Sequence, residues 1–98
     1  MSRAMTEEMG TFRDLLDEEQ IEWEDASELN AYPIYRTHFK HRGFRWSVIH
    51  GHGSYGGFNP LTNKDEGLLE LMSNAVNDGD PVGWLTAEQA MEYVLGEK

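Results

Sequence analysis

Residues 34–50 constrain the fold most. Aromatic or apolar side chains alternate with polar ones along much of this stretch, and Arg42-Gly43 interrupts the alternation. Successive side chains of a strand point to opposite faces, and a two-residue turn joins two antiparallel strands in a fixed register. We therefore predict a β-hairpin with the following pairs: His41 with Phe44, Phe39 with Trp46, Thr37 with Val48, and Tyr35 with His50. Arg-Gly is a weaker turn signal than Asn-Gly, so a three-residue loop is the alternative.

This register sorts the side chains of the hairpin onto two faces. The apolar face collects Tyr35, Phe39, Phe44, Trp46 and Val48. The other face collects Ile34, Arg36, His38, Lys40, Arg45, Ser47 and Ile49. A shift of the pairing by one residue would mix the two sets, so the sequence pattern itself supports the register.

Apolar spacings of three and four predict helices on either side of the hairpin. We expect a first helix over residues 11–19, with residues 1–10 as a flexible tail and residues 11–98 as the folded domain. A second helix is expected behind a capping box that opens at Asn63, on a stripe formed by Leu68, Leu69, Met72, Ala75 and Val76. We expect Asn77-Asp78-Gly79 to end that helix with left-handed residues.

Short strands are expected at residues 21–24 and 81–85, and a capping box at Thr86 predicts a last helix. The order is then α-β-β-β-α-β-α. A chain of 98 residues has room for one hydrophobic core. The sequence therefore predicts a small single α+β domain, in which helices pack on one face of an antiparallel sheet.

The charges are strongly unbalanced, with 18 acids against 8 bases and a net charge of −10. Residues 1–28 hold ten acids and two bases, residues 29–58 hold four bases, all four histidines and no acid, and residues 59–98 hold eight acids and two bases. A field of this sign repels phosphate, which argues against a general nucleic-acid or anionic-membrane binder.

Several classes of protein do not fit this composition. The chain has no cysteine, which excludes disulfides and thiol chemistry. No apolar run approaches the ~20 residues of a membrane span, so we expect a cytoplasmic protein of a bacterial host cell with no membrane partner.

No motif in the chain assigns a catalytic residue, a cofactor or a metal. The G-x-G-x-x-G match at residues 51–56 is not followed directly by a helix, as phosphate binding requires. Zinc needs three or four ligands, and the four histidines lie in a block without a carboxylate. We expect partly buried histidines that hydrogen-bond the loop. A small metal protein centred on His50 and His52 is the alternative.

The acids near the N-terminus form the first candidate site. Asp14, Asp17 and Glu18 are neighbours on a helix surface, and Glu22 and Glu24 continue along the outward face of the next strand. Such a stripe can occupy a Lys/Arg-lined groove built for nucleic acid. The expected protein-binding residues are Asp14, Asp17, Glu18, Glu22, Trp23, Glu24 and Asp25. The alternative is that these acids only maintain solubility.

The basic face of the hairpin is the second candidate site. Arg36, Lys40 and Arg45 could hold single-stranded nucleic acid by their charge, with nearby tyrosines for stacking. The alternative is a solvated face, or one that is salt-bridged to the acidic first helix.

Four runs of the sequence resemble small acidic proteins carried by phages and mobile elements of gut bacteria. They are WSVIHG at residues 46–51, SYGG at 54–57, EGLLELM at 66–72 and PVGWLTAE at 81–88. Such phage proteins are similar in size and charge to the inhibitors aimed at host nucleases, anti-CRISPR proteins among them. Those inhibitors share no common sequence, so the resemblance assigns no residue.

We therefore expect a non-enzymatic acidic protein that inhibits a basic nucleic-acid-binding host protein or nucleoprotein complex, by nucleic-acid mimicry or steric block. An anti-CRISPR-type inhibitor is its most concrete form. A nucleic-acid-binding accessory domain is the alternative, and a homodimer is compatible with either function.

Overall fold

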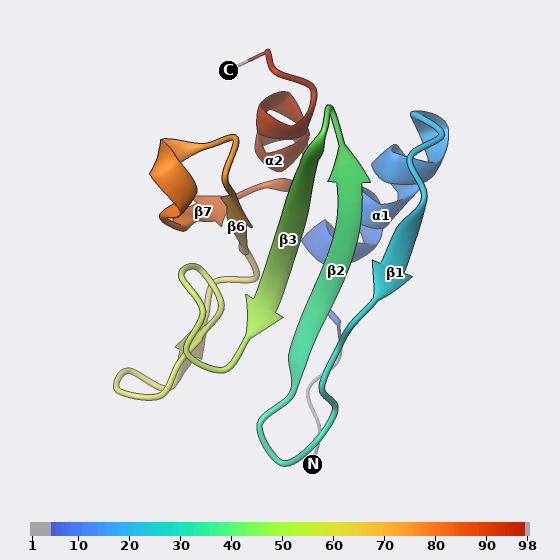
Figure 1. The fold of residues 1–98 in the computed structure, drawn as a ribbon. Helices are drawn as coiled ribbons and strands as arrows, with labels where there is room; N and C mark the ends of the chain where they lie inside the picture. The colour runs from blue at the N-terminus through green and yellow to red at the C-terminus, as the bar shows by residue number, and fades with distance from the viewer. Residues whose placement is uncertain (1–4, 98) are drawn as a thin grey trace.

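The computed structural model describes residues 5–97, and within this range the chain forms a five-stranded antiparallel sheet with helices on one side (Figure 1). The elements are α1 (Glu7–Glu18), β1 (Trp23–Asp25), β2 (Ile34–His41), β3 (Phe44–Gly51), β4 (Phe58–Asn59), β5 (Lys64–Asp65), β6 (Leu69–Ser73), the 3-10 helix η1 (Asn77–Gly79), β7 (Val82–Leu85) and α2 (Ala87–Val94). The sheet has the strand order β1-β2-β3-β6-β7, and β4 pairs with β5 in a separate ribbon. The predicted α+β class is confirmed.

The β2–β3 hairpin forms in the predicted register. Phe39 pairs with Trp46, and the same ladder continues from His41–Phe44 to Ile34–Gly51. The turn residues Arg42 and Gly43 both have positive φ, at 54° and 78°. Two such residues match the right-handed twist of the strands, which explains why a two-residue turn closes this hairpin.

The hydrophobic core lies between the sheet and the two helices. Phe39, Trp46 and Val48 point from the hairpin toward the helices and are buried. The Phe39 ring lies 5.8 Å from Phe12 of α1 and 6.1 Å from Trp46. Each large apolar side chain buried in this way stabilises the fold by roughly 1.5–3 kcal/mol. Both helices pack on this face (Figure 1). On the opposite face, the part around His38, Lys40 and Arg45 is exposed, whereas the segment of Tyr55 covers Glu70.

Helix α1 begins earlier than the sequence analysis expected. It starts at Glu7 rather than near residue 11, and the prediction of a flexible tail is wrong for residues 7–10. Met9 is fully buried and lies three and seven positions before Phe12 and Leu16, on the same helical face. The core therefore holds this part of the chain in place. Residues 1–4 of the expected tail lie outside the described residues.

The helix expected behind Asn63 is wrong, because this segment forms strands. Lys64–Asp65 forms β5, Gly67 has a φ of 71°, and Leu69–Ser73 forms β6 between β3 and β7. Leu69 and Leu71 are both fully buried, at the period of two that a strand requires. Tertiary pairing on both sides of β6 therefore overrides the helical spacing. The expected left-handed residues Asn77, Asp78 and Gly79 do have positive φ.

The last strand and helix agree with the sequence analysis. Strand β7 covers most of residues 81–85, and the capping box at Thr86 is present. The Gln89 N–H donates to Thr86 Oγ1 at 3.2 Å, and the Thr86 N–H donates to Gln89 Oε1 at 2.9 Å. These bonds satisfy two N–H groups at a helix start, and they fix where α2 begins.

Candidate functional site

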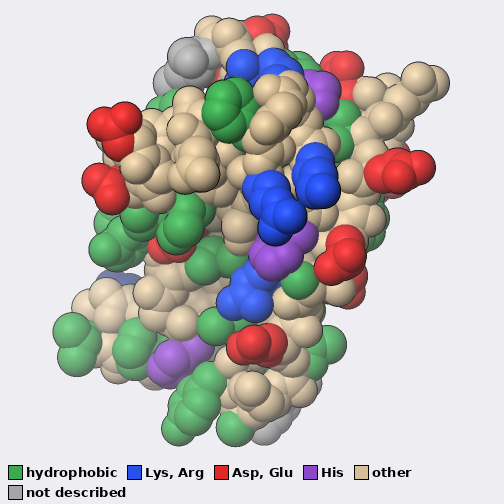
Figure 2. All heavy atoms as spheres, in the orientation of Figure 1, with side chains coloured by type: hydrophobic (Ala, Val, Ile, Leu, Met, Phe, Trp, Pro, Cys, Tyr) green, Lys and Arg blue, Asp and Glu red, His purple; other side chains and the backbone are tan. Residues whose placement is uncertain are grey.

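A stripe of basic side chains runs along the open face of the sheet (Figure 2). We call it the basic stripe; it consists of Arg36, His38 and Lys40 of β2 and Arg45 of β3. Lys40 and Arg45 are direct partners across the β2–β3 ladder. Like charges directly opposite each other destabilise a strand pair, so the Lys40–Arg45 pair lowers the stability of the fold.

The cations of the basic stripe differ in how they are neutralised. Arg36 lies 3.7 Å from the Glu28 carboxylate and also donates to the carbonyl of Ala26. Among the described residues, Lys40 and Arg45 have no carboxylate within ion-pair distance. The end of the basic stripe formed by Lys40 and Arg45 is therefore available to bind an anion.

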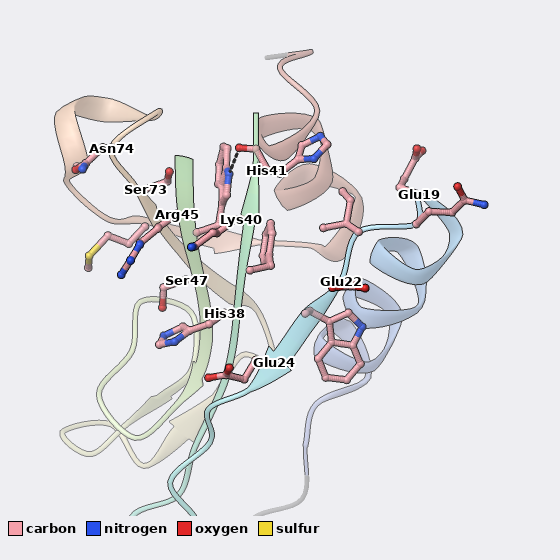
Figure 3. A pocket seen from close by; sticks show the side chains of 17 residues that line it. Glu19, Glu22, Glu24, His38, Lys40, His41, Arg45, Ser47, Ser73 and Asn74 are labelled. Atoms are coloured by element: carbon pink, nitrogen blue, oxygen red, sulfur yellow. Dashed lines mark hydrogen bonds between the residues drawn. The ribbon is translucent and has the colours of Figure 1, made fainter. Parts of the chain in front are cut away.

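A shallow groove of about 980 Å³ lies beside the basic stripe. Carboxylates of Glu19, Glu22 and Glu24 follow its β1 side, and cationic and imidazole groups follow its β2–β3 side (Figure 3). The floor and rim also include Ser47, Met72, Ser73 and Asn74. A groove with walls of opposite charge fits a surface that carries both signs.

The acids predicted from the N-terminal region are exposed, but they do not share one face. Glu24 pairs with His38 and therefore lies on the open face. Trp23 and Asp25 pair with Phe39 and Thr37, which places them toward the helices. Asp14, Asp17 and Glu18 are exposed on α1. The acids thus follow the edge formed by α1 and β1 rather than a single stripe.

Trp23 is half-buried and is held by its own chain. Its indole Nε1–H donates to Asp17 Oδ1 at 2.8 Å, and the Arg13 guanidinium lies 4.7 Å from the ring centroid. A side chain that is already packed and hydrogen-bonded is less suited to insert into a partner. Trp23 therefore serves mainly to join β1 to α1.

Asp25 is similarly engaged within the chain. The hydroxyl and the backbone N–H of Ser27 donate to its carboxylate, and Arg13 lies 3.2 Å away. The Ser27 hydrogen bonds, with a further contribution from the Arg13 charge, hold the pKa of Asp25 below its ordinary value of 3.8. Asp25 is thus an anion with internal partners.

The acids at the end of α1 have an unfavourable electrostatic environment. Asp17, Glu18 and Glu19 occupy the last turn and the C-cap, and that turn holds no basic residue. The carbonyl end of a helix carries a partial negative charge, so each carboxylate there is destabilising. A bound cation would remove this penalty.

The histidines of the glycine-rich region have structural contacts. His50 is buried, and its Nε2 lies 2.8 Å from Asp65 Oδ1 of β5, a partner that lies outside the expected glycine-rich loop. His52 packs between the rings of Tyr32 and Phe58. No group of three His, Asp or Glu side chains within residues 5–97 is placed to hold a metal ion.

The sequence analysis did not single out Trp84 as a candidate site residue. Trp84 of β7 is exposed and stacks on Tyr55, which precedes β4. The two residues are far apart in the sequence, and no motif links them. The only local signal is that each has a neighbouring glycine that permits close approach of the two segments.

Comparisons with protein-family models, with curated proteins and with solved structures give no match to this chain. Neither of the α-helices in the described range is long and apolar enough to cross a membrane.

Proposed function

We propose that this chain is a non-enzymatic binding protein whose acidic edge binds a basic, nucleic-acid-binding protein. The acidic edge consists of Asp14, Asp17, Glu18, Glu19, Glu22 and Glu24. The observation that carries the proposal is the row of exposed carboxylates at the carbonyl end of α1. These carboxylates repel one another and are repelled by the negative end of the helix dipole. Cations of a partner would reduce both repulsions.

The charge distribution supports the same kind of partner. A net charge of −10 attracts a basic protein over distance, and Glu22 and Glu24 extend the acidic edge along the β1 side of the groove, whose other side is cationic. A partner bound there would have its cations covered and would lose access to nucleic acid. An inhibitor of a CRISPR effector is the most concrete form of this function.

The test compares two triple variants of equal charge as baits in a lysate of the bacterial host. The first carries Glu18→Lys, Glu22→Lys and Glu24→Lys. The control carries Glu66→Lys, Asp80→Lys and Glu97→Lys, at exposed acids outside the acidic edge. Each reversal adds two charges, so both variants change from −10 to −4.

We expect the wild type and the control to recover a basic nucleic-acid-binding protein that is lost at about 0.5 M salt, where charges are screened within a few ångströms. The acidic-edge variant should not recover it. Equal recovery by both variants, or recovery of no such protein by the wild type, contradicts the proposal.

A second candidate function rests on the unpaired cations of the basic stripe. Lys40 and Arg45 could bind phosphates of a single strand, because they lack internal partners among the described residues. The test is the anisotropy of a labelled single-stranded oligonucleotide at low salt. Lys40→Gln should weaken binding and reduce its salt dependence, whereas Lys64→Gln, in β5, should not. Absence of binding by the wild type removes this candidate.

A further inference from the structure

An exposed aromatic pair lies at the β7 edge of the sheet, opposite the edge formed by β1. Tyr55 and Trp84 are 48% and 56% exposed. Their ring centroids lie 5.4 Å apart with an interplanar angle of 10°, so the rings are stacked. Tyr55 covers one face of the Trp84 indole, and much of the remaining indole surface is accessible to a ligand.

The backbone holds this pair in place. A Cβ on Gly83 would lie 2.2 Å from the Tyr55 Cβ, and a Cβ on Gly56 would lie 3.0 Å from the Trp84 backbone. The Trp84 N–H also donates to the carbonyl of Tyr55 at 3.2 Å. The two segments are therefore in close contact, and the rings present a preorganised surface.

Trp84 has a strained backbone conformation. Its φ is +56°, a region that bulky residues with a Cβ rarely adopt. Strain of this kind persists only where the surrounding structure enforces it, and it is concentrated at functional sites. The strained conformation of β7 places a large apolar ring in solvent.

A carboxylate adjoins the aromatic pair. Glu70 of β6 is only 8% exposed, and its Oε1 accepts the Tyr55 N–H at 2.8 Å. Among the described residues it has no cation within ion-pair distance. Met72, two positions further along β6, is exposed and adds a polarisable side chain to the same face. The site thus combines two aromatic rings with a carboxylate that has no cationic partner among the described residues.

We propose that the Tyr55–Trp84 pair, with Glu70, binds an arginine side chain of the partner protein. The guanidinium would stack on the free face of the indole, where cation–π attraction and planar stacking act together. The Glu70 carboxylate and the net charge of −10 favour a cation over a neutral planar group. The inference rests on the proposed function in that the partner is basic, but it uses the opposite edge of the sheet.

The test uses the indole N–H resonances of the three tryptophans. Trp23 donates to Asp17 and Trp46 donates to the His41 carbonyl, whereas the Trp84 indole has no such acceptor in the described range. The Trp84 signal is assigned by its loss in Trp84→Phe. The probes are a short glycine-flanked arginine peptide and the same peptide with citrulline, which has the shape of arginine without its charge.

We expect the arginine peptide at tens of millimolar to shift the Trp84 resonance at least several-fold more than the citrulline peptide. The Trp23 and Trp46 resonances should stay in place. Glu70→Gln should reduce the shift, and its folding is checked by those two reference resonances. An equal response to citrulline, or no response to arginine, overturns the inference.

The same titration separates this inference from the proposed function. The acidic-edge triple variant should lose its protein partner and keep the full Trp84 shift. If the shift instead disappears in that variant, the arginine binds at the acidic edge and the Tyr55–Trp84 site is wrong.

Discussion

The Glu8 carboxylate accepts a hydrogen bond of 2.6 Å from the backbone N–H of Ala87. The bond joins the first turn of α1 to the first turn of α2, at a sequence separation of 79 residues. An anion at the start of α2 satisfies a free N–H and also faces the positive end of the helix dipole. Glu8 thus caps the start of α2 from a distant part of the chain, and Thr86 caps it from the adjacent position.

Glu8→Ala should therefore lower the free energy of unfolding by about 1–2 kcal/mol, because the Ala87 N–H loses its acceptor. Glu8→Gln keeps an acceptor and should lose less. The measurement is urea unfolding followed by tryptophan fluorescence. Glu7→Ala, at an exposed neighbouring position, is the control, and a loss of equal size there contradicts the assignment.

Arg45→Glu should raise the free energy of unfolding by about 0.2–1 kcal/mol, because it places opposite charges at the Lys40–Arg45 pair, on the strand that is not adjacent to the carboxylates of β1. Lys64→Glu makes the same change in net charge in β5, away from any like-charged strand partner. A gain that is equal in both variants would mean that the Lys40–Arg45 pair carries no specific repulsion. Urea unfolding at low ionic strength is the suitable measurement.

Asp25→Asn should lower the free energy of unfolding by an amount that depends on pH. Ser27 and Arg13 lower the folded-state pKa of Asp25, so its contribution is fully present above the unfolded pKa and is lost as pH falls through the folded pKa. The difference in stability between wild type and variant should therefore be constant near neutral pH and shrink below about 3.8. A difference in stability that grows on acidification would have the opposite pH dependence and would contradict the prediction. Unfolding curves over a pH series measure it.

Asp65→Ala should destabilise the fold by about 1–3 kcal/mol, because it removes the Nε2 partner of the buried His50. His50 Nδ1 has no hydrogen-bond partner within residues 5–97, so the variant would leave both ring nitrogens without one there. Asp65→Asn retains an acceptor and should recover part of the loss. Equal stabilities of the Ala and Asn variants would show that the hydrogen bond contributes little.

Gly83→Ala should destabilise by about 1–3 kcal/mol, since the new methyl group would overlap the Tyr55 Cβ. Gly10→Ala provides a control of opposite sign. Among the described residues its Cβ would come within 4 Å of Met5 Cε alone, at 3.8 Å. Alanine within α1 should raise the free energy of unfolding by about 0.5–1 kcal/mol. Thermal unfolding of both variants tests the pair.

The hairpin could be predicted from the sequence because its information is local. The alternation of residues 34–50 and the turn at Arg42-Gly43 set both register and faces, so the basic stripe followed directly. The segment that forms β6 carries a less specific signal. Leu68, Leu69 and Met72 fit a helical spacing, and only the neighbouring strands β3 and β7 impose the extended conformation.

The candidate sites show the same limit. The positions of Lys40 and Arg45 follow from the strand period, whereas the contacts of Trp23 with Asp17 and Arg13 depend on how α1 packs. The Tyr55–Trp84 stack depends on the close approach at Gly83 and on the positive φ of Trp84. Neither property has a local sequence signature.

The packing of α1 against α2 also has a consequence for synthesis on the ribosome. A nascent chain can close the β2–β3 hairpin early, because its contacts are local. The buried face of α1, including Met9 and Phe12, packs beside a helix that is translated some eighty residues later, as the Glu8–Ala87 bond shows. Until α2 has emerged, that apolar face lacks part of its cover. We therefore expect this face of the nascent chain to be the part most prone to aggregation until α2 has formed.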